Sequence, residues 1–160
     1  GEMVGESRFM MAGYHANDAA CEEATWVHPT GGKWLRTGDI GMLDDEGFLT
    51  LVDRKKDMIL SGGQNVYPLD IEAIIVDHPS VSEVAVIGIP DEKWGETPLA
   101  VIVLAENATI DAETLTAWAN ERLGKQQRVS GAVVVDELPR NPNGKVLKRE
   151  LRTRFSNLAT

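Results

Sequence analysis

The charge run Arg54-Lys55-Lys56-Asp57, directly after Asp53, divides this chain into two parts with different hydrophobic patterns. Before the run, short apolar stretches alternate with turns that contain glycine, which is typical of β-hairpins. After the run, apolar stretches of strand length and of helix length alternate. The sequence therefore predicts two units, residues 1–54 and residues 55–160, that meet at the charge run.

The first part is predicted to be rich in β-hairpins. The turn at 44–47, Asp-Asp-Glu-Gly, separates the apolar stretches 40–43 and 48–52, and a second glycine-containing turn precedes Trp34. Between these features, the polar and alanine-rich segment 17–25 predicts a short helix, with Asn17 as its N-cap.

The second part predicts a small mixed sheet covered by helices, an α+β fold class. The stretch 84–89 is nearly continuous in apolar residues, so we expect a strand that is buried on both faces. The other expected strands are 100–104 and 132–135. Helices are expected to begin at Pro68, after Asp111 and near Lys148, the second of them with Gly124 beyond its C-terminal end.

Composition excludes several classes of function. The net charge of −9 argues against a nucleic-acid partner, since such partners are met by a basic face. The longest apolar stretches are far shorter than the ~20 residues that a membrane-spanning helix needs. Cys21 is the single cysteine, so no intramolecular disulfide is possible and a cytoplasmic location is expected. The three histidines lack metal-ligand spacing, and no metal-ligating residue is predicted.

Asp39 is the first candidate for chemistry. It follows Thr37-Gly38 at the start of an expected strand. A carboxylate held rigidly there can accept two hydrogen bonds from a vicinal diol, such as that of a ribose. Taken alone, an Asp after a Gly is more often a turn residue or a cap.

The charge run and the turn after it allow two interpretations. One is a solvated charge run beside an ordinary hairpin. The other is a hinge, because hinges are a few residues at the ends of elements that absorb backbone rotation. On the second interpretation, Gly62 and Gly63 let a substrate approach the backbone closely.

Lys145 is the third candidate. A loop with two prolines and a glycine, 139–144, holds it just before the last expected helix. A lysine there can place a positive charge next to oxygens that become more negative in a transition state. Lys148, Arg149 and Arg152 are instead predicted to be solvated helix residues.

Taken together and in this order, these stretches resemble the adenylate-forming (AMP-binding) superfamily of acyl-CoA synthetases, aryl-CoA ligases, luciferases and nonribosomal peptide adenylation domains. The resemblance extends from about the start of the chain to Phe155. The sequence is most similar to fatty- or aromatic-acyl-CoA synthetases over 53–57 and 61–68, and further similar segments are 89–96 and Met11-Ala12-Gly13-Tyr14-His15.

The resemblance implies a role for each candidate. Asp39 would hold both ribose hydroxyls of the adenylate, and Arg54 would contact the same nucleotide. Lys56 matches the family's hinge. Lys145 matches the lysine that bridges the acyl carboxylate and the α-phosphate during adenylation. The residues that would face the CoA thiol are Ser61, Gly62, Gly63 and Trp94.

The sequence also departs from the family. The segment 125–129 lacks the Lys-Val-Pro of many relatives, and Gln64 stands where relatives place Glu or Arg. The Ser/Thr/Gly-rich phosphate loop that precedes Lys-Gly in the family is missing. Most of the ATP and acyl pockets are therefore expected in an N-terminal domain of the same chain, upstream of residue 1. We expect these 160 residues alone to be inactive.

By this resemblance, the parent is an acid-thiol ligase that uses a carboxylic acid, ATP and CoA, with Mg²⁺ on the ATP phosphates and its ligands elsewhere. One alternative is an adenylating enzyme whose acceptor is a carrier protein. Another is a non-catalytic module that has kept the fold.

Overall fold

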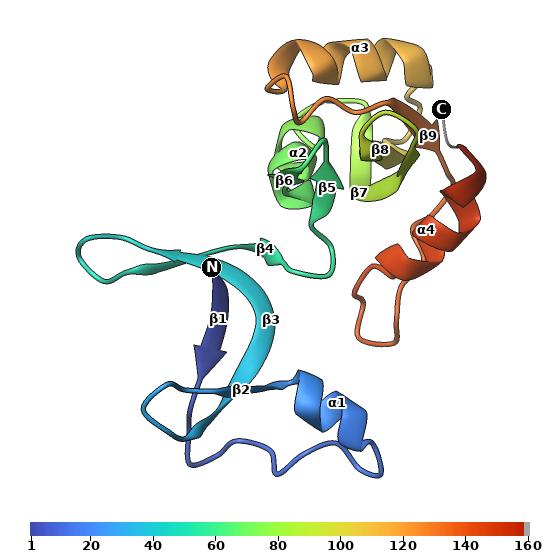
Figure 1. The fold of residues 1–160 in the computed structure, drawn as a ribbon. Helices are drawn as coiled ribbons and strands as arrows, with labels where there is room; N and C mark the ends of the chain where they lie inside the picture. Colours follow the sequence, from blue (N-terminus) through green and yellow to red (C-terminus); the bar gives the residue numbers. More distant parts are fainter. Residues whose placement is uncertain (159–160) are drawn as a thin grey trace. The chain divides into compact units, whose positions relative to one another are not determined.

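The computed structural model describes residues 1–158, and its contacts divide the chain into two compact units (Figure 1). The first unit is Gly1–Lys56 and the second begins at Asp57. This division lies two residues beyond the one expected from the sequence, just before the last residue of the charge run.

The first unit is built around one long strand, β3 (Lys33–Leu43). β3 pairs antiparallel with β1 (Glu2–Gly5), β2 (Thr25–Val27) and β4 (Leu49–Arg54), and α1 (Asp18–Glu23) precedes β2. The expected hairpin and short helix are both present. β1 was not expected, because its four residues carry no alternating pattern and acquire a strand conformation by pairing with β3.

Local hydrogen bonds explain why these elements begin and turn where they do. The Asn17 side chain accepts from Ala20 N at 3.1 Å, which confirms the expected cap of α1. In the turn after β3, Asp44 Oδ1 accepts from the N–H of Phe48 at 2.8 Å, and Gly47 takes a φ of +86°.

The first unit has almost no core of its own. Among residues 1–56, all of which the structure describes, Gly41 is the one buried residue. Large apolar side chains lie on the surface, among them Phe9, Leu43, Phe48 and Leu51. A sheet with so little apolar burial gains little of the free energy that normally stabilises a fold.

The second unit is a mixed sheet with helices on both faces. β7 (Val81–Asp91) and β8 (Gly95–Leu104) form a long antiparallel hairpin. β5 (Ile59–Ser61) pairs with β6 (Gln64–Val66) and with the start of β8, and β9 (Gly131–Val134) pairs with β8 in parallel. The helices are α2 (Pro68–Ile75), α3 (Ala112–Arg122) and α4 (Lys148–Phe155), followed by the 3₁₀ turn η1 (Ser156–Leu158).

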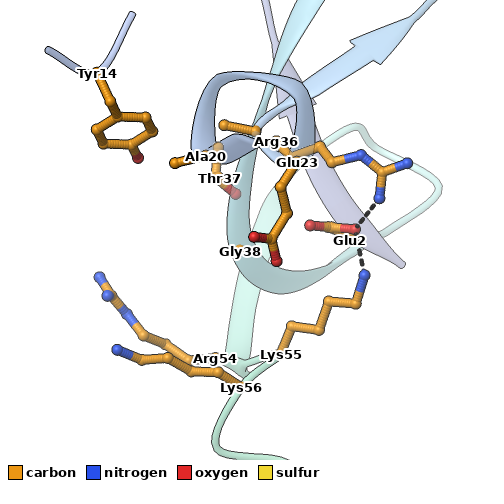
Figure 2. Close-up of a pocket in the computed structure, with 11 residues that line it drawn as sticks. Glu2, Tyr14, Ala20, Glu23, Arg36, Thr37, Gly38, Arg54, Lys55 and Lys56 are labelled. Atoms are coloured by element: carbon orange, nitrogen blue, oxygen red, sulfur yellow. Dashed lines mark hydrogen bonds and ion pairs between the residues drawn. The ribbon is translucent and has the colours of Figure 1, made fainter. Parts of the chain in front are cut away.

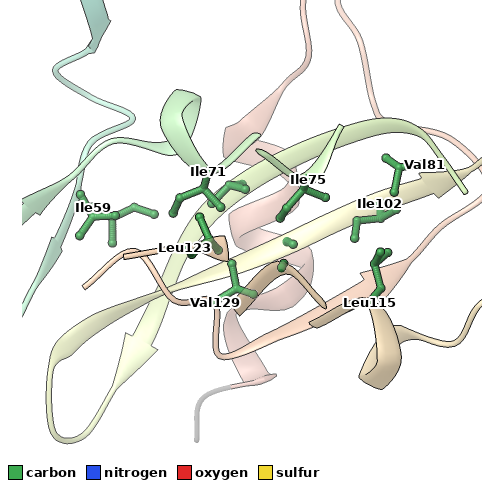
Figure 3. Close-up of a cluster of buried hydrophobic side chains, with 12 residues drawn as sticks. Ile59, Ile71, Ile75, Val81, Ile102, Leu115, Leu123 and Val129 are labelled. Carbon is green, nitrogen blue, oxygen red and sulfur yellow. The ribbon is translucent and has the colours of Figure 1, made fainter. Parts of the chain in front are cut away.

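Alternate residues of β7 and β8 enter two separate apolar clusters. Val86 and Ile102 pack with residues of α2 and α3, including Ile71, Ile75 and Leu115 (Figure 3). On the opposite face, the cluster with α4 comprises Ala85, Ile87, Ile89, Leu99, Val101, Val135, Leu138, Leu151 and Phe155. The predicted burial of the strand 84–89 on both faces is confirmed.

The starts of α2 and α3 and the end of α3 lie where the sequence predicted them. Pro68 occupies the first turn of α2 and Asp111 caps α3, accepting from Thr114 N at 2.7 Å, as expected. Gly124 follows the C-cap Leu123 of α3, as expected, but it does not have a positive φ. The chain leaves α3 through Leu123, which is extended with φ −79° and ψ 142°, so no residue with positive φ is needed there.

Two of the three basic residues expected to be solvated on the last helix are in ion pairs instead. Lys148 Nζ lies 2.7 Å from Glu72 Oε1, and Arg152 Nη2 lies 2.9 Å from Asp57 Oδ1. Residues four apart share one side of a helix, and this side of α4 faces carboxylates from earlier elements. Arg149 is exposed. Among the described residues, no helix is long and apolar enough to cross a membrane.

Candidate functional site

Asp39 and Arg54 lie opposite each other on paired strands of the first unit. They are partners in the register of β3 and β4, and Arg54 Nε lies 3.2 Å from Asp39 Oδ1. Asp39 keeps 30% of its side chain exposed. The structure therefore brings together the two residues expected to contact a ribose, with a carboxylate that solvent can reach.

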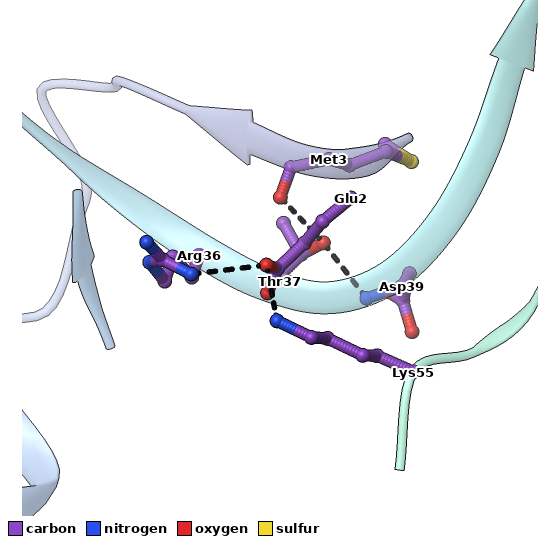
Figure 4. A network of polar contacts seen from close by, with 6 residues as sticks. All are labelled: Glu2, Met3, Arg36, Thr37, Asp39 and Lys55. Carbon is purple, nitrogen blue, oxygen red and sulfur yellow. Dashed lines mark hydrogen bonds and ion pairs between the residues drawn. The ribbon is translucent and has the colours of Figure 1, made fainter. Parts of the chain in front are cut away.

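Thr37 and Gly38 set the orientation of Asp39. Thr37 Oγ1 donates to Met3 O and accepts from Asp39 N, both at 3.1 Å (Figure 4). Gly38 has a φ of +73°, a conformation that favours glycine. The hydroxyl thus ties the backbone of Asp39 to the neighbouring strand β1.

A cavity of about 610 Å³ opens next to this pair. Asp39 does not line it, but its neighbour Gly38 and its partner Arg54 do. Figure 2 shows Arg54 and Lys56 extending together, while Lys55 turns to Glu2. The full lining is Glu2, Tyr14, Ala20, Glu23, Ala24, Arg36, Thr37, Gly38, Arg54, Lys55 and Lys56.

The cavity is locally positive in a chain whose net charge is −9. Four of its lining residues are cations and two are carboxylates. Glu2 is already neutralised, because its Oε2 accepts from Lys55 Nζ at 2.9 Å and from Arg36 Nη1 at 3.1 Å. The hydrogen bond from Lys55, with the charges of Lys55 and Arg36, lowers the pKa of Glu2. Arg54 is paired with the partly exposed Asp39, and Lys56 forms no ion pair among the described residues, so these two cations can attract an anionic group.

In the second unit, the turn between β5 and β6 packs against Trp94. Gly62 and Gly63 have φ values of +58° and +78°, so both positions favour glycine. A Cβ atom on Gly62 would lie 2.8 Å from Cε3 of the Trp94 ring, and Gly62 N donates to Trp94 O at 2.8 Å. Ser61 pairs with Gly95. The residues expected to face the CoA thiol thus form one surface, with Trp94 half exposed.

Lys145 is exposed near the end of the loop between β9 and α4. An antiparallel bridge between Arg140 and Val146 closes this loop, and Gly144 has a φ of +81°. Lys145 belongs to the second unit and Asp39 and Arg54 belong to the first. The structure brings Asp39 next to Arg54 and Gly62 next to Trp94, and it places Lys145 in a separate loop of the second unit.

Sequence reasoning did not single out several residues that line the cavity. Tyr14 lies in a segment noted only for its general resemblance, although an aromatic residue after glycine was a usable signal. Glu2 and Arg36 gave no signal. The ion pair of Glu2 with Lys55 joins positions 53 residues apart, which no local pattern reveals.

No group of three or more His, Cys, Asp or Glu that could hold a metal ion is found in residues 1–158.

Comparison with known proteins matches this chain to the C-terminal part of AMP-binding enzymes. Residues 70–145 match the family model of the AMP-binding enzyme C-terminal domain. The chain is 43% identical over 156 residues to the long-chain-fatty-acid–CoA ligase FadD13 of Mycobacterium tuberculosis, covering 98% of this chain and 30% of the relative.

Two of the solved structures similar to this chain contain ATP or an acyl-adenylate. The ATP-bound MatB from Rhodopseudomonas palustris superimposes with a TM-score of 0.81 at 35% identity, over 92% of this chain and 28% of that one. The o-succinylbenzoate CoA synthetase from Bacillus subtilis, in complex with its acyl-adenylate intermediate, gives 0.81 at 39% identity, over 95% and 30%. The chain thus spans about 30% of the length of the relatives that it matches.

Proposed function

We propose that the protein carrying this chain activates a carboxylic acid with ATP and transfers the acyl group to CoA. The premise is that this chain belongs to the AMP-binding acyl-CoA ligases and corresponds to their C-terminal part. The observation that carries the proposal is the pairing of Asp39 with Arg54 beside a locally positive cavity. The first half-reaction forms an acyl-adenylate and pyrophosphate, and the second forms the thioester.

The residues of the first unit fit the ribose end of a nucleotide. Asp39 holds a rigid, partly exposed carboxylate, and one oxygen is available beyond the one that contacts Arg54. A carboxylate can accept hydrogen bonds from the two hydroxyls of a ribose. Arg54 and Lys56 supply positive charge that suits phosphate oxygens.

In the first half-reaction, Lys145 acts through its charge. Its ammonium lies next to the acyl carboxylate and the α-phosphate, where negative charge builds up as the acyl–phosphate bond forms. Magnesium, when bound to the ATP phosphates, neutralises part of their charge, and none of the residues described here is assigned to hold it.

In the second half-reaction, we assign the surface of Ser61, Gly62, Gly63 and Trp94 to the acceptor. Gly63 has no atom within 4 Å of the position where its Cβ would be, so a slender chain such as pantetheine can approach the backbone there. The same surface suits the pantetheine arm of a carrier protein. Comparing free CoA with a carrier protein as acceptor distinguishes these alternatives.

The test is a separation of the two half-reactions in the full-length protein. Lys145→Ala is expected to slow adenylate formation by about 10²–10³-fold, because it removes a charge that stabilises the transition state. Thioester formation from a supplied acyl-adenylate is expected to continue. Lys125→Ala, at another exposed lysine of the second unit, is the matched control and is expected to affect neither rate.

Equal losses in both half-reactions of Lys145→Ala would contradict the assignment of this lysine to adenylation. Full activity in both would show that neither step needs this lysine. Absence of both half-reactions in the unsubstituted full-length protein would favour a non-catalytic module.

A further inference from the structure

We propose that Asn141 is a positioning residue that fixes the backbone of Lys145, and that Arg140 and Glu83 anchor the same loop to the sheet. This inference rests on the proposed adenylation role of Lys145. On this inference, Asn141 does not contact substrate and acts through the position of Lys145.

Asn141 forms hydrogen bonds with both the N–H and the C=O of Lys145. Its Oδ1 accepts from Lys145 N at 2.9 Å and from Asn143 N at 3.0 Å. Its own backbone N donates to Lys145 O at 2.9 Å. Asn141 O also accepts from Gly144 N at 2.9 Å, so one residue organises the whole tip of the loop.

Arg140 connects this tip to the sheet. Its Nη1 donates to Gly144 O at 2.6 Å, and its Nη2 forms an ion pair with Glu83 Oε2 on β7. The planar guanidinium suits such a fork, whereas a lysine has no second nitrogen to complete it. Because this ion pair is about 40% exposed, we expect it to contribute less than Asn141.

Lys145 is exposed, so its side chain is not held by packing and its backbone must be fixed by other contacts. A lysine side chain has a flexible four-carbon stem, so its ammonium can be aimed only as well as its backbone is fixed. A misplacement of about 1 Å can cost about 100-fold in rate. The loop lies outside both apolar clusters except for Leu138 and the partly buried Val146, so changes at Asn141 need not unfold the unit.

Two variants at Asn141 separate positioning from general stability. Asn141→Leu keeps the approximate shape but removes the acceptor, and we expect adenylation to slow by about 10- to 100-fold with the KM for ATP unchanged. Asn141→Asp keeps an oxygen at the same place and is expected to restore the rate to within about threefold of the wild type. Thioester formation from a supplied acyl-adenylate is expected to continue in both.

Amide hydrogen exchange measures the positioning itself, in the 160-residue chain and without any catalytic assay. The Lys145 amide is expected to exchange about tenfold faster in Asn141→Leu than in Asn141→Asp, while the Val101 amide in the core exchanges equally in both. Equal exchange of Lys145 in the two variants would overturn the inference.

The kinetic outcomes distinguish this inference from the proposed function. If Lys145→Ala abolishes adenylation while Asn141→Leu adenylates normally, positioning by Asn141 is wrong and the role of Lys145 stands. If Lys145→Ala adenylates normally, the proposed function of the lysine is wrong and the inference falls with it.

Glu83→Ala tests the anchor. Glu83 lies on β7 and contacts the loop through Arg140, so a loss of about two- to fivefold in adenylation supports anchoring. Glu121→Ala, which breaks the exposed pair with Arg122, is the control and is expected to change nothing. If Arg140→Ala slows adenylation and Glu83→Ala does not, the anchor to Glu83 is wrong, and Arg140 acts through its hydrogen bond to Gly144 O or on substrate.

Discussion

Several carboxylates of this chain accept hydrogen bonds from backbone N–H groups at the ends of elements. Asp111 does so at the start of α3, Asp44 in the turn after β3, and Glu96 at Leu60 N of β5, at 2.9 Å. Such contacts satisfy donors that have no partner in the regular hydrogen-bond pattern.

Asp111 gives the clearest pH dependence. The hydrogen bonds from the backbone N–H and the hydroxyl of Thr114 lower the pKa of Asp111 in the folded state. A lowered folded pKa means that the ionised acid stabilises the fold at pH values above the unfolded pKa, about 3.9, and that this stabilisation is lost as pH falls through the folded pKa.

The variant Asp111→Asn keeps a good N-cap without the charge. We expect it to be less stable than the wild type at pH 7 and equally stable near pH 2, as measured by urea unfolding of the 160-residue chain. A stability difference that is constant between pH 2 and 7 would show that the charge of Asp111 plays no part.

Contacts within a few residues could be predicted from the sequence, whereas contacts between distant residues could not. The caps Asn17 and Asp111 were found because their partners lie three residues away. Asp39 and Arg54 were proposed from resemblance, and their ion pair depends on the register of two strands. The pair of Glu83 with Arg140 joins positions 57 residues apart, and no local pattern indicates it.

At the level of elements, the free edge of β7 is covered by α2 and α4. β7 pairs with β8 on one side. On its other side, Glu72 Oε1 of α2 accepts from Val86 N at 2.8 Å and also contacts Lys148 Nζ of α4 at 2.7 Å. The Glu72 carboxylate thus accepts a hydrogen bond from an edge N–H of β7 and links α2 to α4, which pack on opposite faces of the sheet.

We expect Glu72→Ala to lower the free energy of unfolding by about 1–3 kcal/mol, because it leaves the N–H of Val86 and the mostly buried ammonium of Lys148 without this partner. Glu83→Ala, on the exposed part of the same strand, is the control and is expected to cost at most about 1 kcal/mol. Denaturant unfolding of both variants measures the difference. Equal effects would mean that Glu72 behaves as an ordinary surface carboxylate.

The expectation that Lys148 and Arg152 are solvated was wrong, because both side chains form ion pairs with carboxylates of other segments. Their spacing and the polarity of the helix were interpreted correctly as amphipathic, and Leu151 and Phe155 are buried. A basic residue at the border of the apolar face is exposed or paired according to what the neighbouring element offers. Glu72 and Asp57 are supplied by segments far away in the sequence.

At the level of the whole molecule, the two units differ in how far each can be understood alone. The second unit has a core on both faces of its sheet, and its strands and helices followed from hydrophobic periodicity. The first unit exposes most of its large apolar side chains, so its sequence pattern predicted hairpins but could not indicate what they pack against. The cavity combines residues from positions 2 to 56, which only the tertiary structure brings together.

The last prediction concerns Lys56, the final residue of the first unit. The two proposed half-reactions need two arrangements of catalytic groups, and a hinge at Lys56 would allow one small domain to present two faces. Among the described residues, no hydrogen-bond partner of the Lys56 N–H is found, so proline there removes no hydrogen bond. It does fix φ near −65° and restricts Lys55.

We therefore expect Lys56→Pro in the full-length protein to slow one half-reaction, thioester formation, about tenfold or more relative to the other, while Lys56→Ala leaves both nearly unchanged. The measurement is the single-turnover rate of each half-reaction in both variants. Thermal unfolding of both variants shows whether they are folded. A solvated lysine would tolerate both substitutions, or would lose stability equally for both steps. If folded Lys56→Pro slows neither step selectively, Lys56 belongs to an ordinary solvated charge run, and the change between half-reactions must occur at other residues.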